Sequence, residues 1–238
     1  TLIDTAQNYA AGRCEELVGQ ATTDYPREKV QVLTKQNRLK LSYDDVIKGC
    51  HESLKRLGIE YIDYFVCHGP NPDFDLADFF KASNQLHKDG LIRNVGVSNF
   101  GVNSLQIALD TSEIPIALNQ VSFSINDSDI LTSGTYDFCL KHNVPIQAYR
   151  PLVDIQKEED SYKLLSDIAA RLEKTPHQIL IAYLNSFEGM HFTTRASTKE
   201  HWKQIQEALG IKLEESDIDA LQKIHITKQG AFGHFLAL

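Results

Sequence analysis

Four ionisable residues, Asp4, Tyr9, Lys35 and His68, stand at or just after the ends of short apolar runs in the first third of the chain. A lysine ammonium beside a phenol favours the phenolate, and a paired aspartate keeps that lysine charged and oriented. A histidine near the tyrosine can donate a hydrogen bond to a substrate oxygen. The four side chains together suit a general acid that protonates an oxygen as it gains negative charge.

Each of these residues also has a purely structural interpretation. Asp4 could start an Asx-turn, Tyr9 could be a half-buried loop aromatic, Lys35 could be a solvated charge, and His68 could be a turn residue before Gly69. Turn chemistry does not require four ionisable groups at such positions, so we favour catalysis. The sequence shows no serine or cysteine nucleophile with a base, and no metal-ligand spacing. We therefore expect neither acyl transfer nor a metal site.

Short β-rich runs alternate with longer amphipathic segments along the chain. We expect strands near residues 1–4, 30–35, 62–68, 94–99, 116–121, 145–150 and 191–195. We expect helices near residues 12–22, 42–57, 75–88, 101–110, 129–142, 161–173, 176–186, 198–209 and 215–225. In the helix over 42–57, Ser42 and Asp45 resemble a capping box and Gly58 suits the helix end.

Strict alternation of strands and helices predicts parallel strands with crossover helices. A doubly wound sheet and a (β/α)₈ TIM barrel both fit this pattern. No G-x-G-x-x-G turn or P-loop occurs, and polar residues gather at the carboxyl ends of many strands, as in barrel active sites. We therefore predict one α/β barrel domain over 1–238. We count seven βα units where a barrel needs eight, and Met190 is the only methionine, so we expect this chain to lack the first unit.

Composition narrows the class of partner. The formal net charge is −8, which disfavours nucleic acid and anionic membranes. No apolar run approaches the length of about 18 residues that predicts a membrane span. The four cysteines are scattered, which is typical of reduced thiols, and no signal-peptide pattern occurs. We expect a cytoplasmic protein, a monomer or weak homo-oligomer, acting on a small molecule.

Several segments resemble motifs of the aldo-keto reductase family in the family's own order. They are IDTAQNY, SLKRLGIEYIDYFVCHGP, VGVSNF, LNQV and QAYRPL. The resemblance implies a (β/α)₈ barrel that binds NADPH without a Rossmann motif. It implies a catalytic tetrad of Asp4, Tyr9, Lys35 and His68, with Tyr9 as proton donor.

The resemblance also implies a set of cofactor-binding residues. Ser98, Asn99 and Gln120 would hold the nicotinamide carboxamide, and Tyr149 would stack on the ring. Ser98 and Asn99 could also cap the helix expected over 101–110. The remaining predicted contacts are Arg150, Leu152, Arg195, Ser197 and His201.

The predicted phosphate end of this site departs from the family pattern. Ala196, His201 and Ile205 replace the usual hydroxyl, arginine and asparagine, so NADH is an alternative to NADPH. Arg150 replaces the usual serine and could meet the pyrophosphate or form a salt bridge. Substrate selection is expected from residues 151–160 and 228–238.

Two functions follow from these residues. The first is NAD(P)H-dependent reduction of an aldehyde or ketone, a small-molecule carbonyl substrate, with Tyr9 donating the proton. The alternative is a catalytically weak or inactive cofactor-binding or regulatory barrel of the same fold. The four ionisable groups favour the enzyme, whereas the altered phosphate end favours impaired binding.

Overall fold

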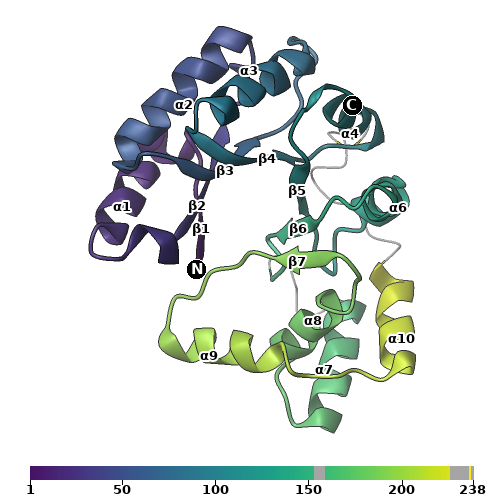
Figure 1. Ribbon diagram of the computed structural model, residues 1–238. Coiled ribbons are helices and arrows are strands. Elements are labelled where there is room, and N and C mark those ends of the chain that lie inside the picture. Colours follow the sequence, from purple (N-terminus) through teal and green to yellow (C-terminus); the bar gives the residue numbers. More distant parts are fainter. Residues whose placement is uncertain (153–158, 226–235, 237–238) are drawn as a thin grey trace. The chain divides into compact units, whose positions relative to one another are not determined.

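A computed structural model describes residues 1–152, 159–225 and 236 of the chain (Figure 1). Two compact units are distinguished: the first contains Thr1–Asn119 and the second begins at Gln120. Most of the two segments expected to select the substrate, 151–160 and 228–238, lies outside the described residues. The single-domain assignment stays a prediction.

The first unit repeats a strand-helix pattern from its first residues onward. Its elements are β1 (Leu2–Asp4), η1 (Tyr9–Gly12), α1 (Arg13–Thr22), η2 (Arg27–Lys29), β2 (Gln31–Gln36), α2 (Tyr43–Leu57), β3 (Ile62–Cys67), α3 (Leu76–Lys88), β4 (Ile92–Ser98), α4 (Val102–Thr111) and the start of β5 (Ile116–Ser122). Strands β1 to β4 pair in parallel, which confirms the crossover pattern.

The second unit continues the alternation with more helical material. It contains α5 (Asp129–Thr132), α6 (Thr135–Lys141), β6 (Ile146–Tyr149), α7 (Asp160–Leu172), α8 (Pro176–Leu184), β7 (Met190–Phe192), α9 (Lys199–Ala208) and α10 (Glu215–His225). Within the described residues the strands follow chain order from β1 to β7. A doubly wound sheet would reverse that order, so the sheet has the topology of a (β/α)₈ barrel, as predicted.

Helix boundaries follow the signals expected from the sequence, with one exception. Ser42 caps α2 by accepting the Asp45 N–H, and Gly58 ends it with a left-handed φ of 66°. The Asp45 side chain accepts from the Ser42 hydroxyl instead of its main-chain N–H, so only half of the capping box forms. The helix expected over 129–142 is wrong as a single element: it breaks into α5 and α6 where Gly134 adopts a φ of 78°.

The inner side chains of the first unit pack in a layer across several strands. Leu33, Val66 and Leu118 form one cluster from β2, β3 and β5. A Cβ on Gly96 of β4 would lie 3.2 Å from the side chains of Val66 and Leu118, so the glycine permits this layer to close. Helices α1 to α4 pack against one another in chain order outside these strands (Figure 1).

Candidate active site

Lys35 at the end of β2 is the most deeply buried charge among the predicted catalytic residues. Its side chain is 1% exposed, and its ammonium pairs with the Asp4 carboxylate at the end of β1. The Lys35 Nζ also donates to the Thr5 carbonyl oxygen at 3.0 Å. A buried ammonium needs such compensation, because burial without partners would cost several kcal/mol. The strand ends thus hold Lys35 in one orientation.

Tyr9 lies over this lysine at the start of η1. The Lys35 Nζ is 5.1 Å from the centroid of the Tyr9 ring, and the His68 ring centroid is 5.5 Å from it at an interplanar angle of 75°. The Tyr9 N–H donates to the Ala6 carbonyl at 3.1 Å, which folds the loop back. The residue is 40% exposed, so part of it is reachable from solvent. The structure brings all four predicted catalytic residues together.

His68 follows β3 and is held in its neutral form. Burial, followed by the charges of Lys35 and Arg38, lowers the pKa of His68 from 6.5 to about 4. Its buried Nδ1 has no hydrogen-bond partner among the described residues. A neutral imidazole carries one N–H and can donate one hydrogen bond to an uncharged or anionic oxygen.

The side chains of Gln7 and Gln36 join the segment that carries Tyr9 to the strand end that carries Lys35. Neither glutamine was predicted from the sequence. Gln7 Nε2 donates to Gln36 Oε1 at 2.8 Å and to Ser53 Oγ at 3.1 Å. Gln7 Oε1 accepts the Asn37 N–H at 3.0 Å. The only sequence signal was position, because Gln7 lies inside IDTAQNY and Gln36 directly follows Lys35.

Ser98 ends β4 within the first unit, Asn99 directly follows it, and both residues are buried. The Asn99 amide donates to the Ser98 hydroxyl at 3.0 Å, and Asn99 has a left-handed φ of 58° that asparagine tolerates better than most residues. Helix α4 starts after Gly101 without a side-chain cap, so the capping interpretation of these two residues is wrong.

The predicted cofactor residues near β5 and β6 belong to the second unit. Gln120 donates to Gln147 Oε1 at 2.6 Å, and Tyr149 is half-buried at the end of β6. Burial raises the pKa of the Asp127 carboxyl, and the charge of Arg150 opposes that rise. This interaction does not decide between the two alternatives expected for Arg150, which stay predictions.

The predicted phosphate residues surround the start of α9. Arg195, Ser197 and His201 are all exposed, and the Thr198 hydroxyl caps the helix by accepting the His201 N–H at 3.1 Å. Two of the three unusual residues have a structural explanation, because Ala196 packs against a buried cluster that contains Ile205. Leu152 packs against the same cluster.

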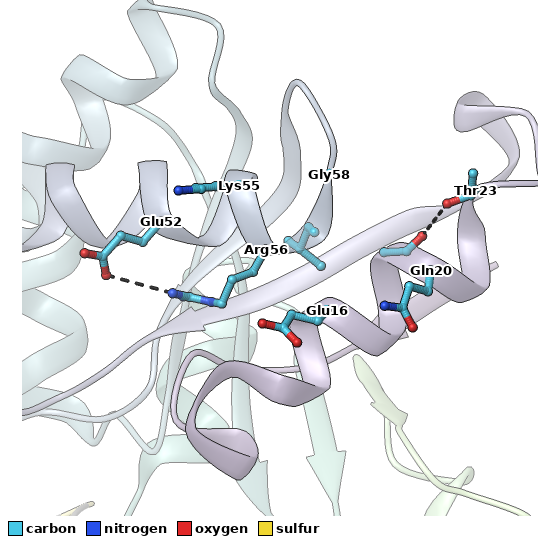
Figure 2. A pocket seen from close by; sticks show the side chains of 9 residues that line it. Glu16, Gln20, Thr23, Glu52, Lys55, Arg56 and Gly58 are labelled. Atoms are coloured by element: carbon cyan, nitrogen blue, oxygen red, sulfur yellow. Dashed lines mark hydrogen bonds and ion pairs between the residues drawn. The ribbon is translucent and has the colours of Figure 1, made fainter.

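A hollow on the outside of the first unit lies between α1 and α2. It is lined by Glu16, Gly19, Gln20, Thr23, Glu52, Lys55, Arg56, Leu57 and Gly58 (Figure 2). None of these residues belongs to the predicted site. The Thr23 hydroxyl donates to the Gly19 carbonyl at 2.9 Å, and Arg56 and Glu52 form a loose ion pair at 3.9 Å. Arg56 makes a shorter ion pair with the buried Glu15, at 2.6 Å.

The described part of the chain contains no group of three His, Cys, Asp or Glu side chains placed to hold a metal ion. No helix within the described ranges is both long and apolar enough to cross a membrane.

The family profile of the Aldo/keto reductase family matches residues 1–226. The chain belongs to the aldo-keto reductase family. It is 28% identical over 236 residues to the NADPH-dependent alpha-keto amide reductase of Saccharomyces cerevisiae, covering 93% of this chain and 74% of that protein. It is 29% identical to the methylglyoxal reductase YeaE of Escherichia coli, covering 97% and 81%.

Solved aldo-keto reductases share the fold. The thermostable aldo-keto reductase Tm1743 is 34% identical, with a TM-score of 0.89 over 93% of this chain and 81% of that one. An aldo-keto reductase from Klebsiella pneumoniae, solved with NADPH, is 29% identical, with a TM-score of 0.84 over 94% and 80%. These likenesses confirm the (β/α)₈ fold class that the strand order indicated.

Proposed function

We propose that this aldo-keto reductase uses NADPH to reduce a small aldehyde or ketone to an alcohol, with Tyr9 as the proton donor. The arrangement of Tyr9 between the Lys35 ammonium and the His68 ring carries the proposal. The names of the relatives support it, because alpha-keto amide reductase and methylglyoxal reductase both denote carbonyl reduction.

The chain's own residues would divide the work at the carbonyl. The His68 N–H donates to the carbonyl oxygen and fixes its direction. The Tyr9 hydroxyl delivers a proton to that oxygen as negative charge develops, and the Lys35 ammonium stabilises the phenolate that remains. Asp4 pairs with the Lys35 ammonium and holds it in place.

The residues present suit a nicotinamide dinucleotide. Buried Ser98 and Asn99 offer hydroxyl and amide groups of the kind that bind a carboxamide, and Gln120 offers a further amide. Arg195, Ser197 and the amino end of α9 suit a phosphate, because helix N-termini attract anions. The bound cofactor supplies the hydride that reduces the carbonyl carbon.

The proposal is tested by two measurements on the purified chain. Fluorescence titration with NADPH and NADH should show binding, and methylglyoxal or an activated aromatic aldehyde should then drive NADPH consumption. Binding without turnover of any carbonyl would favour the alternative, an inactive cofactor-binding barrel. An absence of binding to either cofactor would contradict both functions.

A further inference from the structure

Two amide side chains, buried Gln36 and half-buried Gln7, lie where the three segments that carry the predicted catalytic residues meet. Gln36 directly follows Lys35, is 0% exposed, and its carbonyl accepts the His68 N–H at 3.1 Å. Gln7 lies two positions before Tyr9, and its own N–H donates to the Lys35 carbonyl at 3.2 Å. The side-chain bond between Gln7 and Gln36 therefore links the loop that carries Tyr9 to the strand end that carries Lys35.

The hydrogen-bond partners fix the direction of both amides. Gln36 Nε2 faces the carbonyl oxygens of Lys40 at 2.6 Å and Asp45 at 3.4 Å, so Gln36 presents its oxygen to Gln7. Gln7 presents its own oxygen to the Asn37 N–H and its nitrogen to Gln36 and Ser53. Exchanging the oxygen and the nitrogen of either amide would place donors against donors or acceptors against acceptors. Only one orientation of each side chain therefore satisfies these hydrogen bonds.

Helix α2 leaves room for this pair by carrying a glycine opposite it. A Cβ on Gly49 would lie 2.3 Å from Gln36 Oε1 and 2.9 Å from Gln7 Nε2. Ser53, one turn further along α2, is buried and accepts from Gln7. The amides are therefore clamped between β2 and α2, and their side chains cannot shift without moving one of these elements.

We propose that the Gln7–Gln36 amide pair is a positioning device that holds the loop of Tyr9 in register with Lys35 during carbonyl reduction. The inference rests on the proposed function, because it assigns the pair a role in that reaction. Neither amide touches the reacting atoms. Their effect passes through the distance and direction between the Lys35 ammonium and the Tyr9 ring, where a displacement of about 1 Å can cost about 100-fold in rate.

The test compares Gln7→Met, Gln36→Met and the double variant with wild type. Methionine keeps the length of the side chain and removes its hydrogen bonds. Gln31→Met is the matched control, because Gln31 is an exposed glutamine at the other end of β2. Each single variant should lose about 10-fold or more in kcat, with a KM for NADPH close to wild type. The double variant should lose less than the product of the two single losses, because both changes break the shared Gln7–Gln36 bond.

The split between kcat and KM separates positioning from mere stability. A displaced Tyr9 should lower kcat in both single variants while the KM for the carbonyl substrate stays close to wild type, and Gln31→Met should change neither. Ser53→Ala, which removes only one acceptor of Gln7, should give a smaller change in the same direction and serves if a glutamine variant does not fold.

Unchanged kcat in folded Gln7→Met, Gln36→Met or Ser53→Ala, even with a lower melting temperature, would overturn the positioning role alone. An absence of turnover by wild type would instead overturn the proposed function, and the positioning role with it.

Discussion

In the first unit, the side chains predicted for catalysis are joined by short contacts around a buried lysine. In the second unit, the side chains predicted for the cofactor phosphate stand exposed at the start of α9. Lys35 has a carboxylate and a carbonyl as partners, whereas Arg195 and His201 are solvated. We therefore expect strong electrostatic interactions at fixed distances around Lys35. Near α9 we expect weak electrostatic interactions that depend on salt.

The largest expected effect comes from removing the buried charge. Lys35→Met should lower kcat by about 100- to 10,000-fold, because Tyr9 loses the cation that stabilises its phenolate. Cofactor binding, followed by fluorescence, should be retained. Lys48→Met on α2 removes a lysine whose side chain is 75% exposed and should leave kcat unchanged. A Lys35→Met enzyme with wild-type kcat would show that the buried charge of Lys35 does not contribute to catalysis.

A second effect follows from the neutral state of His68. Its pKa is lowered to about 4 in the folded chain, so the unfolded chain binds more protons between pH 6.5 and about 4. The free energy of unfolding should therefore fall as the pH drops through that window, with a contribution from His68 on the order of 1 to 3 kcal/mol.

Chemical denaturation at several pH values should show a shallower fall for His68→Gln than for wild type. The two proteins have to be compared because burial also lowers the pKa of His225, so His225 contributes to the pH dependence of wild type as well. His191→Gln, at an exposed site on β7, should match wild type. Equal slopes for wild type and His68→Gln would contradict the assigned state of His68.

The smallest effect is expected at the exposed end of α9. Arg195→Ala should weaken NADPH binding by about 2- to 5-fold at low salt, because an exposed ionic contact contributes at most about 1 kcal/mol. NADH binding should change less, and added salt should reduce the difference. Lys203→Ala, also exposed on α9, should have no effect on either. A loss of NADPH binding that does not depend on salt would contradict the expected difference between the start of α9 and the surroundings of Lys35.

The sequence predicted the elements and the strand-end positions of Asp4, Lys35 and His68 because both depend on local patterns, and the catalytic roles of these residues stay predictions. Strand ends place Asp4, Lys35 and His68, and the periodicity of apolar residues marked the helices to within a few positions. The break at Gly134 escaped prediction because its neighbours kept a helical pattern. The link between Gln7 and Gln36 spans 29 positions, and no local signal indicates such a contact.

The region around α9 shows a different limit. The family pattern has an asparagine of the cofactor site at the position of Ile205. The structure places this isoleucine in a buried cluster with Ile181 and Ala208. Its apolar side chain is explained by packing. The contribution of Arg195, Ser197 and His201 to cofactor binding stays a prediction, since exposed side chains make few contacts that could reveal their role.

The most direct measurement of the central claim is single-turnover reduction of methylglyoxal by the NADPH complex of Tyr9→Phe and of wild type. Phenylalanine keeps the ring beside Lys35 and His68 and removes only the hydroxyl. We predict that Tyr9→Phe binds NADPH as wild type does and reduces the carbonyl about 100- to 10,000-fold more slowly. Reduction at the wild-type rate would contradict the assignment of Tyr9 as the proton donor.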